Sequence, residues 1–170
     1  MIALLRAVSI GALLLCAACA QQDAAPAPEL VAPSAGQWVL DIEGVHARVD
    51  GAIATGDRAA ARHHIEAALS ATVPTGVSAE HRRVVHQDLL FRLAGVELSA
   101  SGGEAALRAS ERGLALGRFD DLFTANLLLS AGRALETLGR DTEAADSYYR
   151  ALKINEALLS RVLATDAGAP

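Results

Sequence analysis

The chain has 170 residues, a formal charge of −5 and only 4% aromatic residues, while 52% of its residues are hydrophobic. The mild acidity argues against nucleic acid and anionic lipid surfaces as partners. Abundant Ala and Leu with few aromatic residues favour close helix packing over a β-sandwich. After the first twenty residues, no segment alternates apolar and polar residues as a half-buried strand would.

The first residues have the composition of an export signal. A single positive charge, at Arg6, precedes an apolar run over 7–18. A run of about a dozen residues suits a signal peptide and is short for a membrane-spanning helix. We therefore expect residues 1–18 to be a signal peptide.

The end of this run, Cys-Ala-Ala-Cys at 16–19, resembles the lipobox of bacterial lipoproteins, although Cys16 stands where Leu is usual. The resemblance implies cleavage before Cys19 and acylation of its thiol. With Gln21 two positions later, it implies an outer-membrane lipoprotein that faces the periplasm. Both cysteines lie in this region, so an acyl anchor would account for a thiol that has no disulfide partner. The alternative is ordinary secretion by cleavage after Ala20, because small residues flank that bond as well.

The segment 19–36 holds three of the five prolines of the chain, at Pro26, Pro28 and Pro33. Proline lacks the amide donor and blocks helix formation, so we expect an extended tether of about 50 Å. A helical domain over 37–166 would follow, large enough to bury about two-thirds of its unfolded surface. A flexible tail would occupy 167–170.

Turn and capping residues divide the expected domain into six helices. In the first of them, Val45, Val49 and Ala52 recur three or four positions apart, as on one face of an amphipathic helix. The expected helices are a first from about Trp38 to Gly56, a second over 57–71, a third from a cap at Ser78 to Ser101, a fourth over 104–116, a fifth over 122–138 capped by Asp120, and a sixth over 142–165 for which a break near Asn155 or a straight continuation are both open.

A recurring spacing links these helices. A small residue is followed four positions later by a larger one, and then by an Ala-Leu or Gly-Leu pair. The copies begin at Ala61, Ala106 and Ala144, 45 and 38 residues apart, and Ser110 weakens the second copy. Such a period is typical of stacked helical hairpins, none of which can bury its apolar face alone.

The third copy, over 128–155, resembles a tetratricopeptide repeat. Gly132 stands where the first helix of the repeat needs a small residue, and Gly139 is the turn glycine. Ala144 and Tyr148 are the small and large residues of the second helix. The resemblance implies an all-α, right-handed superhelical stack of three hairpins. The alternative is a generic helical bundle with Ala at its contact points.

The sequence also departs from the family pattern. The Trp that is typical of the first helix is replaced by Val45, Leu90 and Leu128 in the three copies. Glu156 stands where the family usually has a proline after Asn155, which favours a last helix that runs on.

In tetratricopeptide stacks, the first helix of each hairpin lines a concave groove that holds peptides or helices. The resemblance therefore implies a protein or peptide partner and no cofactor, and for a small lipoprotein a partner from an envelope assembly, secretion or pilus system. An apolar centre with a mixed polar rim suits such a groove. The implied groove residues are Glu43, His46 and Asp50 in the first hairpin, Asp88, Phe91 and Leu98 in the second, and Asn126, Leu129, Arg133 and Glu136 in the third.

Catalytic chemistry has little support in the sequence. There is no Gly-x-Ser-x-Gly motif and no thiol outside the first nineteen residues, so we predict neither catalytic residues nor enzymatic activity. The runner-up function is a helical bundle that binds a metal or small ligand through its histidines. Their spacing argues against it, because adjacent residues on a helix point about 100° apart and no His-Glu-x-x-His motif occurs. The histidines are His46, His63, His64, His81 and His86.

Overall fold

A computed structural model describes residues 34–167, with side chains up to residue 164. The expected signal peptide over 1–18, the lipidation site Cys19 and nearly all of the expected tether lie outside the described residues. Within 34–167 the chain forms six α-helices and no strand. The prediction of an all-α domain is therefore confirmed.

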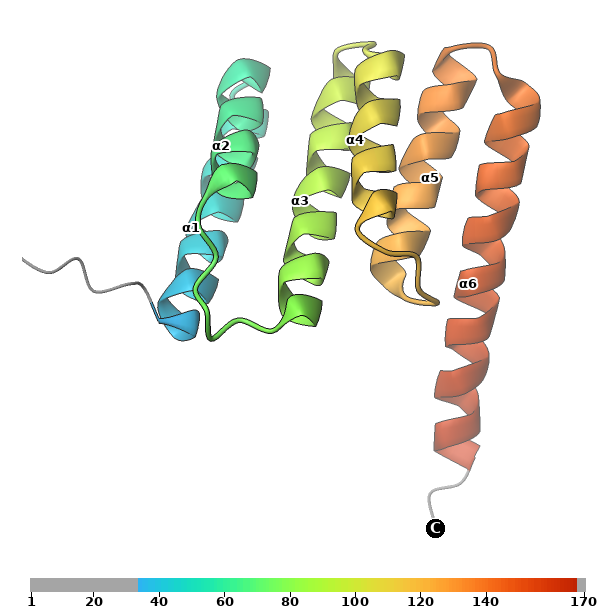
Figure 1. Cartoon of the computed structure of the whole chain (residues 1–170). Coiled ribbons are helices and arrows are strands. Elements are labelled where there is room, and N and C mark those ends of the chain that lie inside the picture. The colour runs from blue at the N-terminus through green and yellow to red at the C-terminus, as the bar shows by residue number, and fades with distance from the viewer. Residues whose placement is uncertain (1–33, 168–170) are drawn as a thin grey trace, which may run out of the picture. The chain divides into compact units, whose positions relative to one another are not determined.

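The six helices have bounds close to those expected from the sequence. The first helix begins at Ala35, inside the range expected for the tether, because the Ser34 hydroxyl caps it by accepting a hydrogen bond from the amide of Gln37 at 3.1 Å. The last helix passes through Asn155 without a break. In chain order the helices are α1 (Ala35–Ala54), α2 (Arg58–Ser70), α3 (Ala79–Ser99), α4 (Gly103–Ala115), α5 (Leu122–Thr137) and α6 (Asp141–Ala167) (Figure 1).

Two of the expected helix caps are confirmed and one is wrong. Asp57 caps α2 and Ser78 caps α3, each by accepting a hydrogen bond from the amide three residues further on. The cap of α5 is Asp121 and not Asp120. The helix starts at Leu122, so the extended residue directly before it is Asp121, whose carboxylate accepts from the amide of Thr124 at 2.9 Å.

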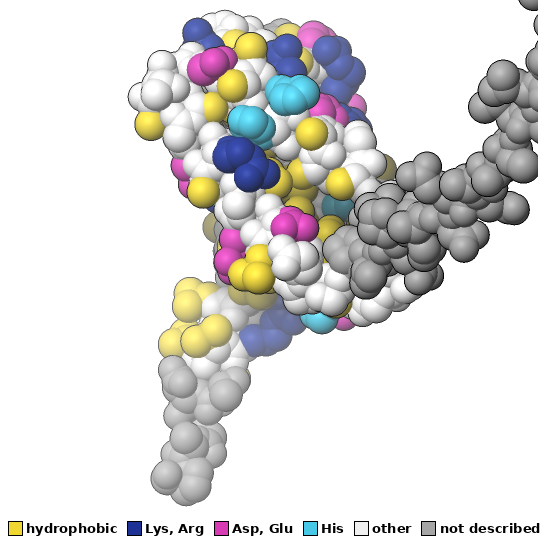
Figure 2. Space-filling view, turned by 90° about the vertical axis from the view of Figure 1, so that its left-hand side faces the viewer, with side chains coloured by type: hydrophobic (Ala, Val, Ile, Leu, Met, Phe, Trp, Pro, Cys, Tyr) yellow, Lys and Arg dark blue, Asp and Glu magenta, His cyan; other side chains and the backbone are white. Residues whose placement is uncertain are grey.

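Consecutive helices run antiparallel to one another (Figure 1). α1 packs on α2 and α2 on α3, while α3 packs on both α4 and α5, and α5 on α4 and α6. The C-terminal half of α6 continues past the start of α5 and projects from the domain (Figures 1 and 2). Among the larger side chains that are fully buried between the helices are Val49, Ile65, Leu89 and Leu127.

Small residues stand where neighbouring helices come closest. A Cβ at Gly113 in α4 would lie 2.6 Å from Cδ1 of Leu127 in α5, and one at Gly132 in α5 would overlap the ring of Tyr148 in α6. The first residues of the three sequence copies, in α2, α4 and α6, are buried. The expectation that small residues bring the helices together is confirmed at these positions.

Candidate functional site

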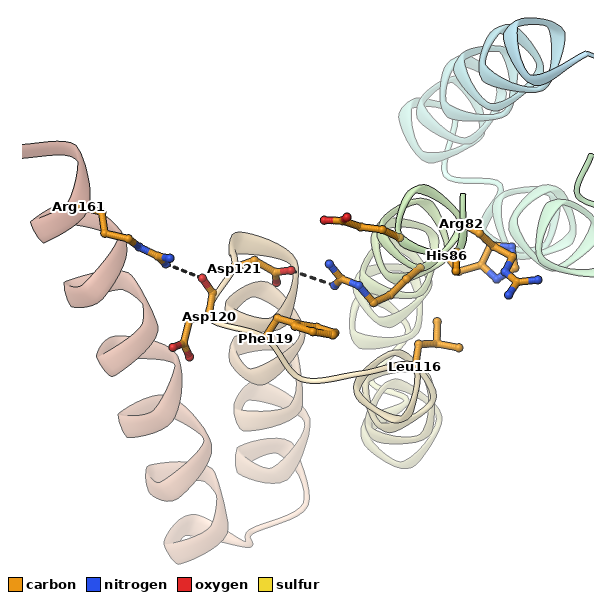
Figure 3. A pocket seen from close by; sticks show the side chains of 10 residues that line it. Arg82, His86, Leu116, Phe119, Asp120, Asp121 and Arg161 are labelled. Atoms are coloured by element: carbon orange, nitrogen blue, oxygen red, sulfur yellow. Dashed lines mark hydrogen bonds and ion pairs between the residues drawn. The ribbon is translucent and has the colours of Figure 1, made fainter. Parts of the chain in front are cut away.

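A cavity of about 710 Å³ opens between the N-terminal end of α3, the loop from α4 to α5, and the C-terminal half of α6 (Figure 3). Its apolar wall is formed by Leu116 and Phe119, which are 44% and 54% exposed. Side chains of both charges surround this wall, so the site offers apolar contact beside polar and ionic contact. The charged and titratable lining residues are Glu80, Arg82, Arg83, His86, Asp120, Asp121 and Arg161.

A buried hydrogen-bond network ties α3 to the end of α4 beside the cavity. Gln87, which is fully buried in α3, donates through Nε2 to the carbonyl oxygens of Gly113 at 3.0 Å and Gly117 at 2.8 Å. The carbonyl oxygen of Gly113 also accepts from the amide of Leu116 at 3.2 Å, so Gln87 adds a second bond there and a side-chain bond to the carbonyl of Gly117 in the loop. Gln87 Oε1 in turn accepts from Arg83 Nη1 at 2.6 Å, which orients the guanidinium.

The oriented Arg83 holds the loop that follows α4. Its Nη1 lies 2.9 Å from Asp121 Oδ2, and its guanidinium lies 4.3 Å from the ring centroid of Phe119. Gly117 has a φ of +141°, and a Cβ there would lie 2.6 Å from Cε2 of Phe119. Glycine therefore lets the loop turn so that the aromatic ring lies over the arginine. The amide of Phe119 also donates to Thr124 Oγ1 at 3.1 Å.

Two titratable groups of the cavity, Asp121 and His86, differ in charge at neutral pH. Burial raises the pKa of Asp121, but hydrogen bonds from Thr124 and Arg83 outweigh burial, so the pKa lies below its usual value and the group is ionised at neutral pH. Burial, and then the charge of Arg82, lower the pKa of His86, so this imidazole is neutral at pH 7. On the third side, Arg161 of α6 donates to the carbonyl oxygen of Asp120 at 2.6 Å (Figure 3).

The predicted partner-binding residues do not line this cavity. Those of the first two hairpins meet at the junction of α1 and α3, where His46 Nε2 lies 3.1 Å from Asp88 Oδ2. Arg92 Nη1 donates to Asp50 Oδ1 at 2.8 Å, and its Nε lies 3.5 Å from Asp88 Oδ2. The structure thus brings His46, Asp50 and Asp88 together around Arg92, which is not among the residues predicted from the sequence.

The apolar residues expected at the groove centre differ in exposure. Phe91 and Leu98 are half-buried and pack against the core, while Leu129 on α5 is 37% exposed. Arg133 is exposed on α5. These residues therefore divide between core packing and the surface.

The expected groove meets α6 near the C-terminal end of α5. Glu136, on α5, accepts a hydrogen bond from the hydroxyl of Tyr148 at 2.6 Å. Burial and this carboxylate raise the pKa of Tyr148 to about 12, so the phenol keeps its proton and remains a donor. This pair holds α5 to α6 next to the close contact at Gly132.

The histidines are spread over the described residues. Within 34–167, no group of three His, Cys, Asp or Glu side chains is placed to hold a metal ion. The rings of His63 and His64 are 5.9 Å apart and tilted by 58°. His81 is exposed, whereas His86 lines the cavity and His46 faces Asp88.

The cavity residues were missed by sequence reasoning, although two signals point to them. Phe119 is an aromatic residue in a short polar connection after Gly117, and exposed aromatic side chains in loops are frequent binding residues. The absence of a proline at Glu156 lets α6 continue far enough to bring Arg161 to the site.

Comparisons of the chain with protein-family models, curated proteins and solved structures found no match. Within 34–167, no helix combines the length and the apolar character needed to cross a bilayer. The fold and the site together define residues 34–167 as an all-α domain with a cavity that is lined by side chains of both charges.

Proposed function

We propose that the chain is a non-enzymatic docking protein of the bacterial cell envelope, in which three tetratricopeptide-like hairpins stack as a right-handed superhelix and hold a protein partner. The antiparallel order of the six helices supports this proposal. So does the contact of Gly132 with Tyr148, which matches the small and large positions of the repeat pattern.

The proposal includes a lipid anchor at Cys19 in the outer membrane, with the helical domain in the periplasm. It is supported by the Cys-Ala-Ala-Cys sequence at 16–19 and by the proline-containing segment that follows. A tether of this kind would let the domain reach a partner while the acyl chains hold it at the membrane.

The observation that carries the docking proposal is the cavity between α3, the α4–α5 loop and α6. Aromatic and arginine side chains are enriched where proteins contact one another, and here Phe119 and Arg82 both line the cavity. An apolar side chain of a bound segment would pack on Phe119 and Leu116, while flanking charges would face Arg82 and Glu80. A volume of about 710 Å³ would hold a few side chains of such a segment.

The polar groups of the cavity favour docking over acid–base chemistry. Asp121 is occupied as the cap of α5 and as the ion-pair partner of Arg83, and its lowered pKa makes it a weak base. Arg83 is likewise engaged by Gln87 and by the ring of Phe119. These groups hold the wall in place and leave its surface for a partner.

The proposal can be tested by placing a photo-crosslinking amino acid at Leu116 of the full chain in its native envelope. We expect the same protein to be captured repeatedly from Leu116 and not from Leu40, an equally apolar residue that is 59% exposed on α1. Phe119→Glu should abolish the capture, because it places a charge on the apolar wall, while circular dichroism stays unchanged.

The position of the crosslinker also decides between the cavity and the groove. Capture from Leu129 but not from Leu116 would place the partner on the face expected from the family resemblance and would remove the cavity from the proposal. No position-specific capture at either residue would overturn the docking function.

A further inference from the structure

The outward face of α6 carries an apolar stripe with the spacing of a coiled coil. Four of its side chains are between 53% and 60% exposed. Its members alternate four and three positions apart along the helix, which is the heptad pattern of a helix that packs on another helix. We call this set the α6 seam; it consists of Ala145, Tyr149, Leu152, Glu156, Leu159 and Leu163.

No other described helix covers this seam. α6 packs on α5 through a different side, where Ala144 and Ala151 are buried. Beyond the start of α5 the helix projects, and apolar side chains gather on this projecting part (Figure 2). Contiguous exposed apolar surface of this kind marks a contact surface.

We propose that the α6 seam is a homodimer interface, in which the α6 helices of two copies pack antiparallel about a two-fold axis near Ile154. This proposal goes beyond partner docking at the cavity. The seam is self-complementary, because its members lie at equal distances on either side of position 154. A two-fold axis there makes one contact patch serve both copies, as in the commonest homodimers. The facing pairs would be Ala145 with Leu163, Tyr149 with Leu159, and Leu152 with Glu156.

The charges at the centre of the seam favour this arrangement over a parallel one. Lys153 Nζ lies 2.8 Å from Glu156 Oε2 and 5.6 Å from the ring centroid of Tyr149, so both charges lie next to the apolar stripe. In an antiparallel pair, Lys153 of each copy lies near Glu156 of the other. A parallel pair would instead bring the two Glu156 carboxylates together in the seam, which costs free energy.

The seam also favours a second copy over an unrelated helix. An unrelated helix needs only an apolar stripe, whereas this seam, reversed upon itself, sets the small Ala145 against the large Leu163. The reversal also brings Lys153, which flanks the seam, near Glu156 of the other copy. One polar position within an apolar seam is a device that fixes register and orientation between helices.

The test is sedimentation equilibrium of the full chain in detergent, with Leu159→Glu and its matched control Leu40→Glu. Both leucines are exposed, at 60% and 59%, so neither change should unfold the monomer. We expect the parent to dimerise and Leu159→Glu to weaken dimerisation by about 100-fold or more, since the two-fold axis repeats the change. Leu40→Glu should dimerise like the parent.

Added cysteines test the orientation of the two helices. A mixture of Ala145→Cys and Leu163→Cys chains should form disulfides between the two variants under oxidation, and neither variant alone should do so. The parent chain is the control, because it shows any disulfide that the native cysteines form. Disulfide formation by Ala145→Cys alone would show a parallel pair and overturn the proposal.

Three further results would overturn it: a parent chain that stays monomeric, larger assemblies in place of a dimer, or a dimer that Leu159→Glu leaves intact. The two proposals fail separately. Capture from Leu116 in a monomeric chain would retain the docking function and remove the dimer, whereas a dimer without any capture would do the reverse.

Discussion

Gly132 and Gly51 show how the same residue type has different roles at different positions. Gly132 lies where α5 meets the ring of Tyr148, and any Cβ there overlaps that ring. Gly51 lies on the exposed side of α1, and a Cβ there would have no neighbour within 4 Å. The first glycine is required by packing, while the second only adds conformational freedom to the unfolded chain.

Gly132→Ala should therefore destabilise the domain by about 1–3 kcal/mol, because a methyl group is forced into a filled contact. Gly51→Ala should stabilise it by about 0.5–1 kcal/mol, because alanine is the better helix former. The free energy of unfolding in urea measures both effects. Equal effects of the two substitutions on the free energy of unfolding would show that α5 and α6 leave room for a methyl group at position 132.

At the scale of a helix, two adjacent acids at the start of α5 have distinct roles. Asp121 accepts from the amide of Thr124 and pairs with Arg83, whereas Asp120 is exposed and takes part through its backbone carbonyl, which Arg161 contacts. Only one of these two carboxylates therefore supports the helix.

Asp121→Ala should lower the free energy of unfolding by about 1–2 kcal/mol, since it removes the cap and leaves Arg83 without its carboxylate. Asp120→Ala is the matched control and should stay within about 0.5 kcal/mol of the parent. Urea unfolding of both variants, with an unchanged slope, checks the assignment. A larger loss of unfolding free energy for Asp120→Ala than for Asp121→Ala would show that Asp120 caps α5, as the sequence suggested.

Local signals predicted most of the helical pattern. Asp57 and Ser78 each precede an apolar helix after a clear break, so their role as caps could be read directly. At Asp120 and Asp121 the break is less sharp, and the choice depends on where the backbone enters α5. For α6 the sequence left a break near Asn155 open, and the missing proline at the next position favoured the continuous helix that the structure has.

The cavity could not be predicted in the same way, because its geometry depends on contacts between distant residues. Gln87 reaches the carbonyls of Gly113 and Gly117, which are 26 and 30 positions away in sequence. Arg83 is held by Gln87 on its own helix and by Asp121, which lies 38 positions further along the chain. No local pattern in the sequence reports such a network.

At the scale of the whole domain, polar bridges join the first hairpin, α1 and α2, to the helices that follow. Arg62 of α2 contacts both oxygens of Glu97 in α3, at 2.6 and 2.7 Å, and Arg112 of α4 binds Glu66 of α2 at 2.8 Å. The hydrogen bond from Arg112 lowers the pKa of Glu66, which keeps this bridge charged at neutral pH. α2 packs less extensively on α3 than the later helices pack on one another, so the first hairpin should open most easily.

Arg62→Ala is the sharpest test of whether the first hairpin opens more easily than the rest of the domain. Glu97 is only 6% exposed and would lose its cationic partner in this variant. A buried carboxylate without a partner costs about 1–3 kcal/mol, and the part of the domain that can relieve this cost by opening is the first hairpin. Hydrogen exchange should therefore speed up in α1 and α2 by about tenfold, with α5 and α6 unchanged.

Arg108→Ala removes an exposed arginine that pairs only with Glu104 within its own helix, at 3.9 Å, and it should leave exchange unchanged throughout. Faster exchange in all six helices of the Arg62→Ala variant would mean that the domain opens as one cooperative unit. Faster exchange confined to α1 and α2 would mean that the polar bridges set a separate, lower stability for the first hairpin. In that case the hairpin could separate from α3 while the cavity, which is built from α3 to α6, stays intact.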